Sequence, residues 1–326
     1  MPVITEREET LSVLEEFRQK GASMAVFCTA SPWNTEAILL ALKRFGQRHG
    51  IPSPAASIGI TFNYPNMPQA QRVTRSRDAV TGFRAIWAHL RELCGRSDSP
   101  YAGVRALPHL DHAHPVRDAW ALTEGLEHLA SVMFDAQELP LDENRRLTAR
   151  YVRDFGDRVV VEGNFEGLGV AVGAVHGMKA AVTSEDEYAD RVAEYVRATG
   201  VDLMVADLGT EQQATTVGDV RYLKDRAQAI SARLGSPSLV LHGGSSLSMN
   251  DFAGLAEDGV IRVNMWTRIA REAAQFATER LVTRLDAARA GNFEALDTKA
   301  FLDDATEKGA EVMEEALDLF GYRKMA

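Results

Sequence analysis

Residues 104–112 read VRALPHLDH, an apolar run of strand length that ends in two histidines around a carboxylate. An imidazole beside an acid at a strand end suits metal ligation combined with proton transfer. Because successive side chains of a strand point to opposite faces, we expect the strand to cover Val104–Pro108 and the histidines to lie in a following loop. The alternative is a histidine-rich surface loop, which His114 would favour. The rest of the chain decides between them.

Seven other short apolar runs share this strand character and alternate with helical patterns. Such alternation indicates parallel βαβ units, and a count of eight favours an α/β fold of the closed (β/α)8 TIM-barrel type. Expected strands cover residues 23–29, 55–62, 104–108, 129–134, 158–161, 201–206, 238–241 and 260–263. Expected helices cover residues 10–20, 35–49, 79–93, 115–126, 141–155, 184–199, 218–234 and 250–256, and residues 63–75 read as a loop.

Two more helices, expected over residues 268–289 and 299–320, exceed what a minimal barrel needs. We therefore predict a single domain over residues 1–326, with the barrel at about 20–267 and a C-terminal helical extension at about 268–326. The apolar face of the extension could pack on the barrel or on a second subunit.

The composition is that of a globular protein, with 45% hydrophobic and 25% charged residues among 326. The net charge of −10 disfavours nucleic-acid binding. Two distant cysteines indicate a reducing compartment. No basic leader and no apolar run of membrane-spanning length is visible. We expect a cytoplasmic protein with a small-molecule partner, and neither a nucleic-acid nor a membrane partner.

Polar residues gather where the expected strands end, which in a barrel is the active-site face. The Gly-Gly pair after one strand could cradle an anion with backbone N–H groups, or be a plain turn. Asp135 could merely cap a turn, whereas Glu162 follows three valines and needs a buried partner. The residues concerned are Asp111, His112, Asp135, Glu162, His242, Gly243, Gly244, Ser245, Asn264 and Thr267.

Six stretches in this order resemble the class II, metal-dependent ketose-bisphosphate aldolases, between about residues 30 and 285. They are HLDH at 109–112, SVMFDAQELPLDENRRLT at 131–148, VEGNFEGLG at 161–169, TSEDEYA at 183–189 with ATGVD at 198–202, LVLHGGSS at 239–246 and GVIRVNMWT at 259–267. The resemblance implies a TIM barrel, a homodimer or homotetramer, and a divalent metal, zinc above all. It implies an aldolase that reversibly cleaves or forms a ketose phosphate through a metal-stabilised enediolate, with sugar phosphates and aldehydes as its substrates.

The resemblance also implies residue roles. Asp111 resembles the acid that protonates the C4 oxygen, and His112 and His242 resemble metal ligands, with His109 in support. Asp135 and Glu162 match acidic positions that bind or support a second metal position. The substrate and phosphate positions are matched by Gly209, Gly243, Gly244, Ser245, Asn264 and Thr267, and more loosely by Asn34 and Thr61.

Three departures fall on chemistry positions. Gln212 and Gln213 stand where the family has its third ligand histidine and a glycine, so Glu211 or Gln212 could complete an oxygen-rich site, or metal binding could be weak. His176 is a remote substitute ligand. The segment after Glu162 lacks the family's loop base, for which Glu166 is a substitute. Trp266 replaces an acid that would face the substrate. These changes predict an unusual substrate rather than fructose 1,6-bisphosphate.

Two other hypotheses remain open. One is a metal-independent barrel lyase or isomerase that uses Asp111, Glu162 and Glu211 as acid–base groups. The other is a non-catalytic homologue that binds sugar phosphates.

Overall fold

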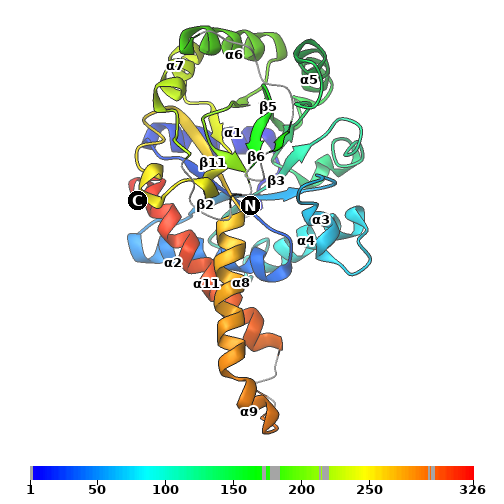
Figure 1. Ribbon diagram of the computed structural model, residues 1–326, viewed down its shortest axis with the longest axis vertical. Coiled ribbons are helices and arrows are strands. Elements are labelled where there is room, and N and C mark those ends of the chain that lie inside the picture. Colours follow the sequence, from blue (N-terminus) through cyan, green and yellow to red (C-terminus); the bar gives the residue numbers. More distant parts are fainter. Residues whose placement is uncertain are drawn as a thin grey trace.

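The computed structural model describes residues 3–170, 174–176, 184–212, 214, 220–292, 294 and 298–326. Its centre is a closed barrel of eight parallel strands (Figure 1), in the spatial order β1-β11-β10-β8-β5-β4-β3-β2. The expected TIM barrel is therefore confirmed. The strands are β1 (Met24–Cys28), β2 (Ala55–Thr61), β3 (Arg105–Ala113), β4 (Ser131–Phe134), β5 (Val160–Asn164), β8 (Leu203–Val205), β10 (Leu239–Leu241) and β11 (Val260–Met265).

Helices surround the barrel, and local signals mark where several of them begin and end. Ser31 and Ser184 accept a hydrogen bond from the backbone three residues on, as N-caps do, and Gly50 and Gly200 end the same two helices with positive φ. The helices are α1 (Arg7–Lys20), α2 (Pro32–His49), α3 (Gln69–Val73), α4 (Ala79–Cys94), α5 (Leu141–Phe155), α6 (Glu185–Thr199), α7 (Lys224–Leu234), α8 (Thr267–Thr283), α9 (Leu285–Arg289) and α11 (Thr298–Leu319).

Several stretches differ from the sequence-based expectation. The helix expected over 218–234 begins only at Lys224, because the described residues 220–223 are not helical. Residues 115–126 form successive turns that lead into a 3-10 helix at Glu124–His128. The Asp118 side chain accepts the N–H groups of His114 and Asn63 there, which favours local turns over a regular helix. Part of the expected 63–75 loop is helix α3. The expected helix at 250–256 is a 3-10 turn over Met249–Phe252.

Helix α1 closes the end of the barrel at which the strands begin, opposite their C-terminal ends. Arg7 donates to both carboxylate oxygens of Asp202 and to the carbonyl of Val159, residues that precede β8 and β5. The C-terminal segment is anchored by Tyr322, whose hydroxyl donates to the Ala55 carbonyl and accepts from the Ala25 N–H. Both contacts leave the other end of the barrel free for the site.

The C-terminal helices leave the barrel as a projecting hairpin (Figure 1), in which α8 and α11 run side by side and α9 lies near the tip. The base of α11 also packs on α2. Within the described part of the chain, no helix is both long and apolar enough to cross a membrane. A three-stranded sheet of β7 (Ala174–His176), β6 (Leu168–Val170) and β9 (Glu211–Gln212) lies outside the barrel.

Candidate active site

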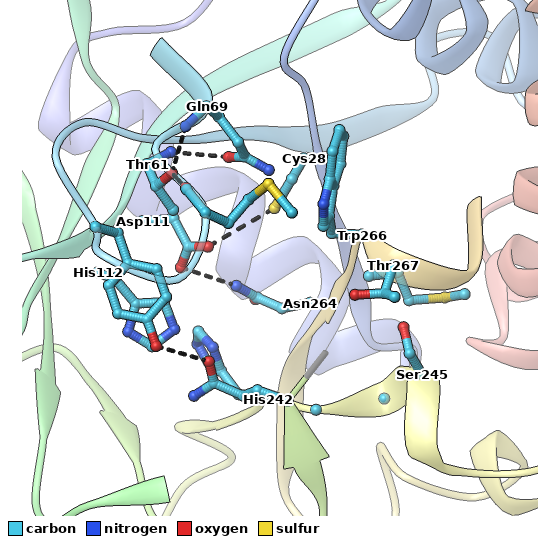
Figure 2. A pocket seen from close by; sticks show the side chains of 16 residues that line it. Cys28, Thr61, Gln69, Asp111, His112, His242, Ser245, Asn264, Trp266 and Thr267 are labelled. Carbon is cyan, nitrogen blue, oxygen red and sulfur yellow. Dashed lines mark hydrogen bonds between the residues drawn. The ribbon is translucent and has the colours of Figure 1, made fainter. Parts of the chain in front are cut away.

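A β-bulge in β3 turns both Asp111 and His112 toward one pocket (Figure 2). β3 pairs with β4 at His109 and Leu110, and then the register slips so that Ala113 pairs with Phe134. His112 has a φ of 49°, in the left-handed region. An extra residue in a strand breaks the alternation of faces. The strand therefore continues through the motif, and the loop expected there was wrong.

His112 is fixed from two sides. Its Nδ1–H donates to Asp135 at 2.7 Å, and its ring stacks on Tyr64 with centroids 4.4 Å apart and planes 10° apart. Burial alone would lower the pKa of His112, but Asp111 and the hydrogen bond to Asp135 outweigh it and raise the pKa to about 8. With Nδ1 engaged, Nε2 is the nitrogen left for a ligand.

His242 follows β10 and is held by a buried chain of charges. Its Nε2–H donates to Glu162 at 3.2 Å, and the other oxygen of Glu162 accepts from Arg262 at 3.2 Å. Glu162 is 0% exposed and Arg262 is 1% exposed. The hydrogen bond from Nε2 to Glu162 selects the tautomer of His242 in which Nδ1 carries no proton and is free to bind a ligand. A carboxylate behind a ligand imidazole orients it and raises its basicity.

Asp111, His112 and His242 are the one group of acids, histidines or cysteines in the described residues that could hold a metal ion. Their ligand atoms lie within 4.8 Å of one another, and all three side chains are buried. Asp111 also accepts from the Asn264 amide at 3.2 Å and from the Cys28 thiol at 3.7 Å. Two imidazoles with carboxylate partners and an acid suit a divalent transition metal.

Gln212 lies at the edge of this group. Its Oε1 accepts from the Tyr64 hydroxyl at 3.1 Å, while its Nε2 is buried without a hydrogen-bond partner among the described residues. An orphaned amide N–H beside His112 and His242 suits a hydrogen-bond acceptor at that place. Gln213 and the side chain of His176 lie outside the described residues.

The opposite side of the pocket holds the residues expected to form an anion cradle. Gly243 has a φ of 71°, and a Cβ there would meet the Glu211 backbone at 2.7 Å, so only glycine fits. Ser245 and Thr267 line the pocket beside it (Figure 2), Ser245 from the 3-10 turn Gly244–Ser246 and Thr267 as the first residue of α8. The Ser245 hydroxyl accepts from the Arg268 N–H at 3.2 Å, and the other N–H groups of this helix N-terminus would favour a phosphate.

Several predicted site residues do not line this pocket. Asp135 and Glu162 stand behind the two histidines. Asn34 accepts from the Ser31 hydroxyl at the start of α2, and Gly209, with a φ of 82°, packs against the Arg221 backbone. The N–H of Glu211 donates to Ser246, and its side chain is absent from the pocket lining.

Glu166, the substitute loop base, accepts from the Tyr188 hydroxyl at 2.5 Å. It is buried, and it too is not among the residues that line the pocket.

Sequence reasoning missed six residues of the pocket and its support, one of which is Met265 at the end of β11. Cys28, Tyr64, Met67 and Gln69 line the pocket, and Arg262 lies beneath it. Arg262 carried a signal, because a charge within the apolar run GVIRVNM needs a buried partner. The others come from the ends of β1 and β11 and from the long connection after β2, where no local pattern marks a pocket residue.

The comparisons with known proteins agree with this geometry. The family model described as fructose-bisphosphate aldolase class-II matches residues 12–324. The chain belongs to the class-II fructose-bisphosphate aldolase family. As a member, it is an aldolase, a carbon–carbon lyase, and the family typically depends on a divalent metal.

Curated relatives of this aldolase are distant. The fructose-bisphosphate aldolase of Streptococcus pneumoniae is 28% identical over 218 residues, which cover 65% of this chain and 70% of the relative. That of Giardia intestinalis is 29% identical over 223 residues, covering 61% and 66%. The crystal structure of Campylobacter jejuni fructose-bisphosphate aldolase superposes with a TM-score of 0.74 at 17% identity, over 97% of this chain and 95% of that one.

Proposed function

We propose that this aldolase reversibly forms and cleaves a ketose phosphate, with dihydroxyacetone phosphate as the donor half and a bound divalent ion, zinc above all. The ketose would not be fructose 1,6-bisphosphate, although the relatives are named for it, because Trp266 and Gln212 depart from the family pattern. The observation that carries the proposal is the convergence of Asp111, His112 and His242 beside an anion cradle.

In this proposal, Nε2 of His112, Nδ1 of His242 and an oxygen from Asp111 or Gln212 would hold the ion. When bound, such an ion supplies Lewis-acid polarisation of a carbonyl, which eases loss of the neighbouring proton. The cradle of Gly243, Ser245 and the α8 N-terminus would bind the donor phosphate and fix the position of its reacting carbon.

Asp111 is placed to move the proton at the other reacting atom. It is the one carboxylate among the described residues that line the pocket. In the direction of synthesis it would protonate the aldehyde oxygen as the new bond forms, and in cleavage it would accept that proton back. Asn264 and Cys28 hold its carboxylate from two sides.

The test is metal analysis of the purified protein combined with exchange of donor hydrogen in D2O. We expect about one divalent ion per chain, and loss of exchange on chelation. His112→Ala and His242→Ala should each abolish ion binding. His49→Ala, a histidine on α2 outside the pocket, serves as the control. A metal-free protein that is indifferent to chelator would refute the metal-dependent proposal.

One observation favours a second candidate, namely the glutamine at the third ligand position. A metal-independent lyase or isomerase would keep its activity in chelator and lose it in Glu211→Gln. The buried position of Glu162, which is bonded to His242 and Arg262, weakens its use as an acid–base group on substrate. A non-catalytic sugar-phosphate-binding homologue would show binding without hydrogen exchange.

We also propose a cytoplasmic homodimer or homotetramer. Both cysteines are free and buried, which is usual for a reducing compartment. Large apolar side chains are exposed on the projecting hairpin, and burial of this surface would favour association. They are Leu281, Val282, Leu285 and Leu302.

A further inference from the structure

The pocket has a second half, which the donor phosphate does not need. We call it the acceptor half and define it by Cys28, Thr61, Met67, Gln69 and Trp266. All five line the pocket. Figure 2 shows Cys28, Thr61, Gln69 and Trp266 gathered on one side of Asp111, apart from Ser245 in the cradle. An aldehyde that reacts beside Asp111 must extend into this half.

No described residue of the acceptor half has a cationic side chain. Among the described residues that line the whole pocket, none is Lys or Arg. The two buried arginines near it are engaged elsewhere. Arg268 donates to the Leu247 carbonyl, and Arg262 donates to Glu162 and Ser131 beneath the pocket.

The Thr61 hydroxyl and the Gln69 side-chain oxygen are already paired within the acceptor half. The Thr61 hydroxyl donates to the Met67 carbonyl and accepts from the Gln69 N–H. The Gln69 Oε1 accepts from the Thr61 N–H at 2.9 Å. What remains to meet a ligand is the Cys28 thiol, the Met67 thioether, the Gln69 NH2 group and the Trp266 indole with its N–H, and none of these groups carries a positive charge.

A phosphate in this half would lose water without gaining a cation, and it would lie near the Asp111 carboxylate. Burial of an unpaired charge is strongly unfavourable. A neutral carbon chain, in contrast, would gain contact with the half-buried Trp266 indole.

We propose that the acceptor substrate is an uncharged aldehyde and that Trp266 determines this specificity. The inference rests on the proposed function. The donor carbon next to the carbonyl loses a proton and bonds to the aldehyde carbon, and the aldehyde oxygen gains a proton, so no further reactant is needed. The donor keeps the only phosphate of the product.

The experiment compares two acceptors that differ only in the phosphate. The metal-loaded full chain is given dihydroxyacetone phosphate with either D-glyceraldehyde or D-glyceraldehyde 3-phosphate, and initial rates of ketose formation are measured. We expect kcat/KM to be higher for D-glyceraldehyde by about tenfold or more. An equal or higher value for the phosphorylated acceptor overturns the inference.

Substitution of Trp266 tests the residue assignment. Trp266→Arg should shift the ratio of the two kcat/KM values toward the phosphorylated acceptor by about tenfold or more. Trp266→Phe, which keeps an uncharged ring, should retain the wild-type ratio whatever its overall rate. An unchanged ratio in Trp266→Arg, with the melting temperature retained, refutes the role of Trp266.

Hydrogen exchange of the donor in D2O, without any acceptor, separates the two levels of the proposal. If the donor exchanges hydrogen but the enzyme prefers the phosphorylated acceptor, the acceptor inference is overturned. The same holds if the donor exchanges hydrogen and neither acceptor gives a ketose. In both cases the proposed donor chemistry is retained. The absence of both exchange and product refutes the proposed function, and the acceptor inference fails with it.

Discussion

At the scale of single residues, Gln212 is one of the positions at which this chain departs from the family pattern. Its amide is paired on one side with the Tyr64 hydroxyl and unpaired on the other. An amide is a weaker ligand for zinc than an imidazole. In the proposed metal site, the two histidines would therefore contribute more of the binding free energy than they would in a three-histidine site.

We predict that Gln212→His tightens zinc binding by about tenfold or more, because a third imidazole would join His112 and His242. Gln212→Leu should weaken it, and this variant is the matched control for loss of the Tyr64 bond. Competition dialysis against a chromogenic chelator measures both. Equal affinities in all three proteins would show that position 212 does not contact the ion.

Arg262 offers a second test at this scale. Its charge balances Glu162, which is fully buried behind His242. We predict that Arg262→Met lowers the free energy of unfolding by about 3–5 kcal/mol, because it leaves a buried carboxylate unpaired. Chemical denaturation measures the loss. Arg262→Met/Glu162→Gln should recover part of it, and no recovery would contradict the pairing.

At the scale of elements, the strands were predictable and the site-forming irregularities were not. Apolar runs such as LVL before His242 mark buried strands directly. The bulge at His112 leaves no local signature, because it depends on pairing with β4. Tyr64 reaches His112 only through the tertiary path of the β2–α3 connection, so residue spacing could not reveal the contact.

Asp118 holds that connection in place. It accepts the N–H groups of both Asn63 and His114. We predict that Asp118→Ala costs about 1–3 kcal/mol of stability, because two partly buried N–H groups lose their partner. It should also raise KM, since Tyr64 follows Asn63 directly. Thermal melts and steady-state kinetics measure the two effects, and Asp118→Asn should retain part of the pairing. An unchanged KM would show that the β2–α3 connection does not influence substrate binding at the site.

At the scale of the whole molecule, length and strand count were enough to predict the barrel and its C-terminal helices. The direction in which the extension projects was not predictable, because the apolar face of α11 could pack equally well on the barrel of the same chain or on a second subunit. In the structure, the base of α11 packs on α2 and α8, while the hairpin tip stands clear of the barrel (Figure 1).

The exposed apolar residues of the hairpin give the proposed oligomer a test. We predict that Val282→Glu combined with Leu285→Glu lowers the mass of the particle in solution, because two charges would oppose burial of this surface. Light scattering after size-exclusion chromatography measures the mass. Val116→Glu, at an apolar residue that is exposed away from the hairpin, is the control. A monomeric wild-type chain would contradict the proposed association.

The bulge in β3 has a consequence for how length changes in the gene would be tolerated. Removal of one residue between Arg105 and Leu110 would exchange the inward and outward faces of everything that follows, sending Asp111 toward the helix layer. The same deletion in the exposed turn at 96–100, before the strand, would leave the faces unchanged. In a scan of single-residue deletions across 95–113, we therefore expect variants before Arg105 to fold and variants from Arg105 onward to fail to fold.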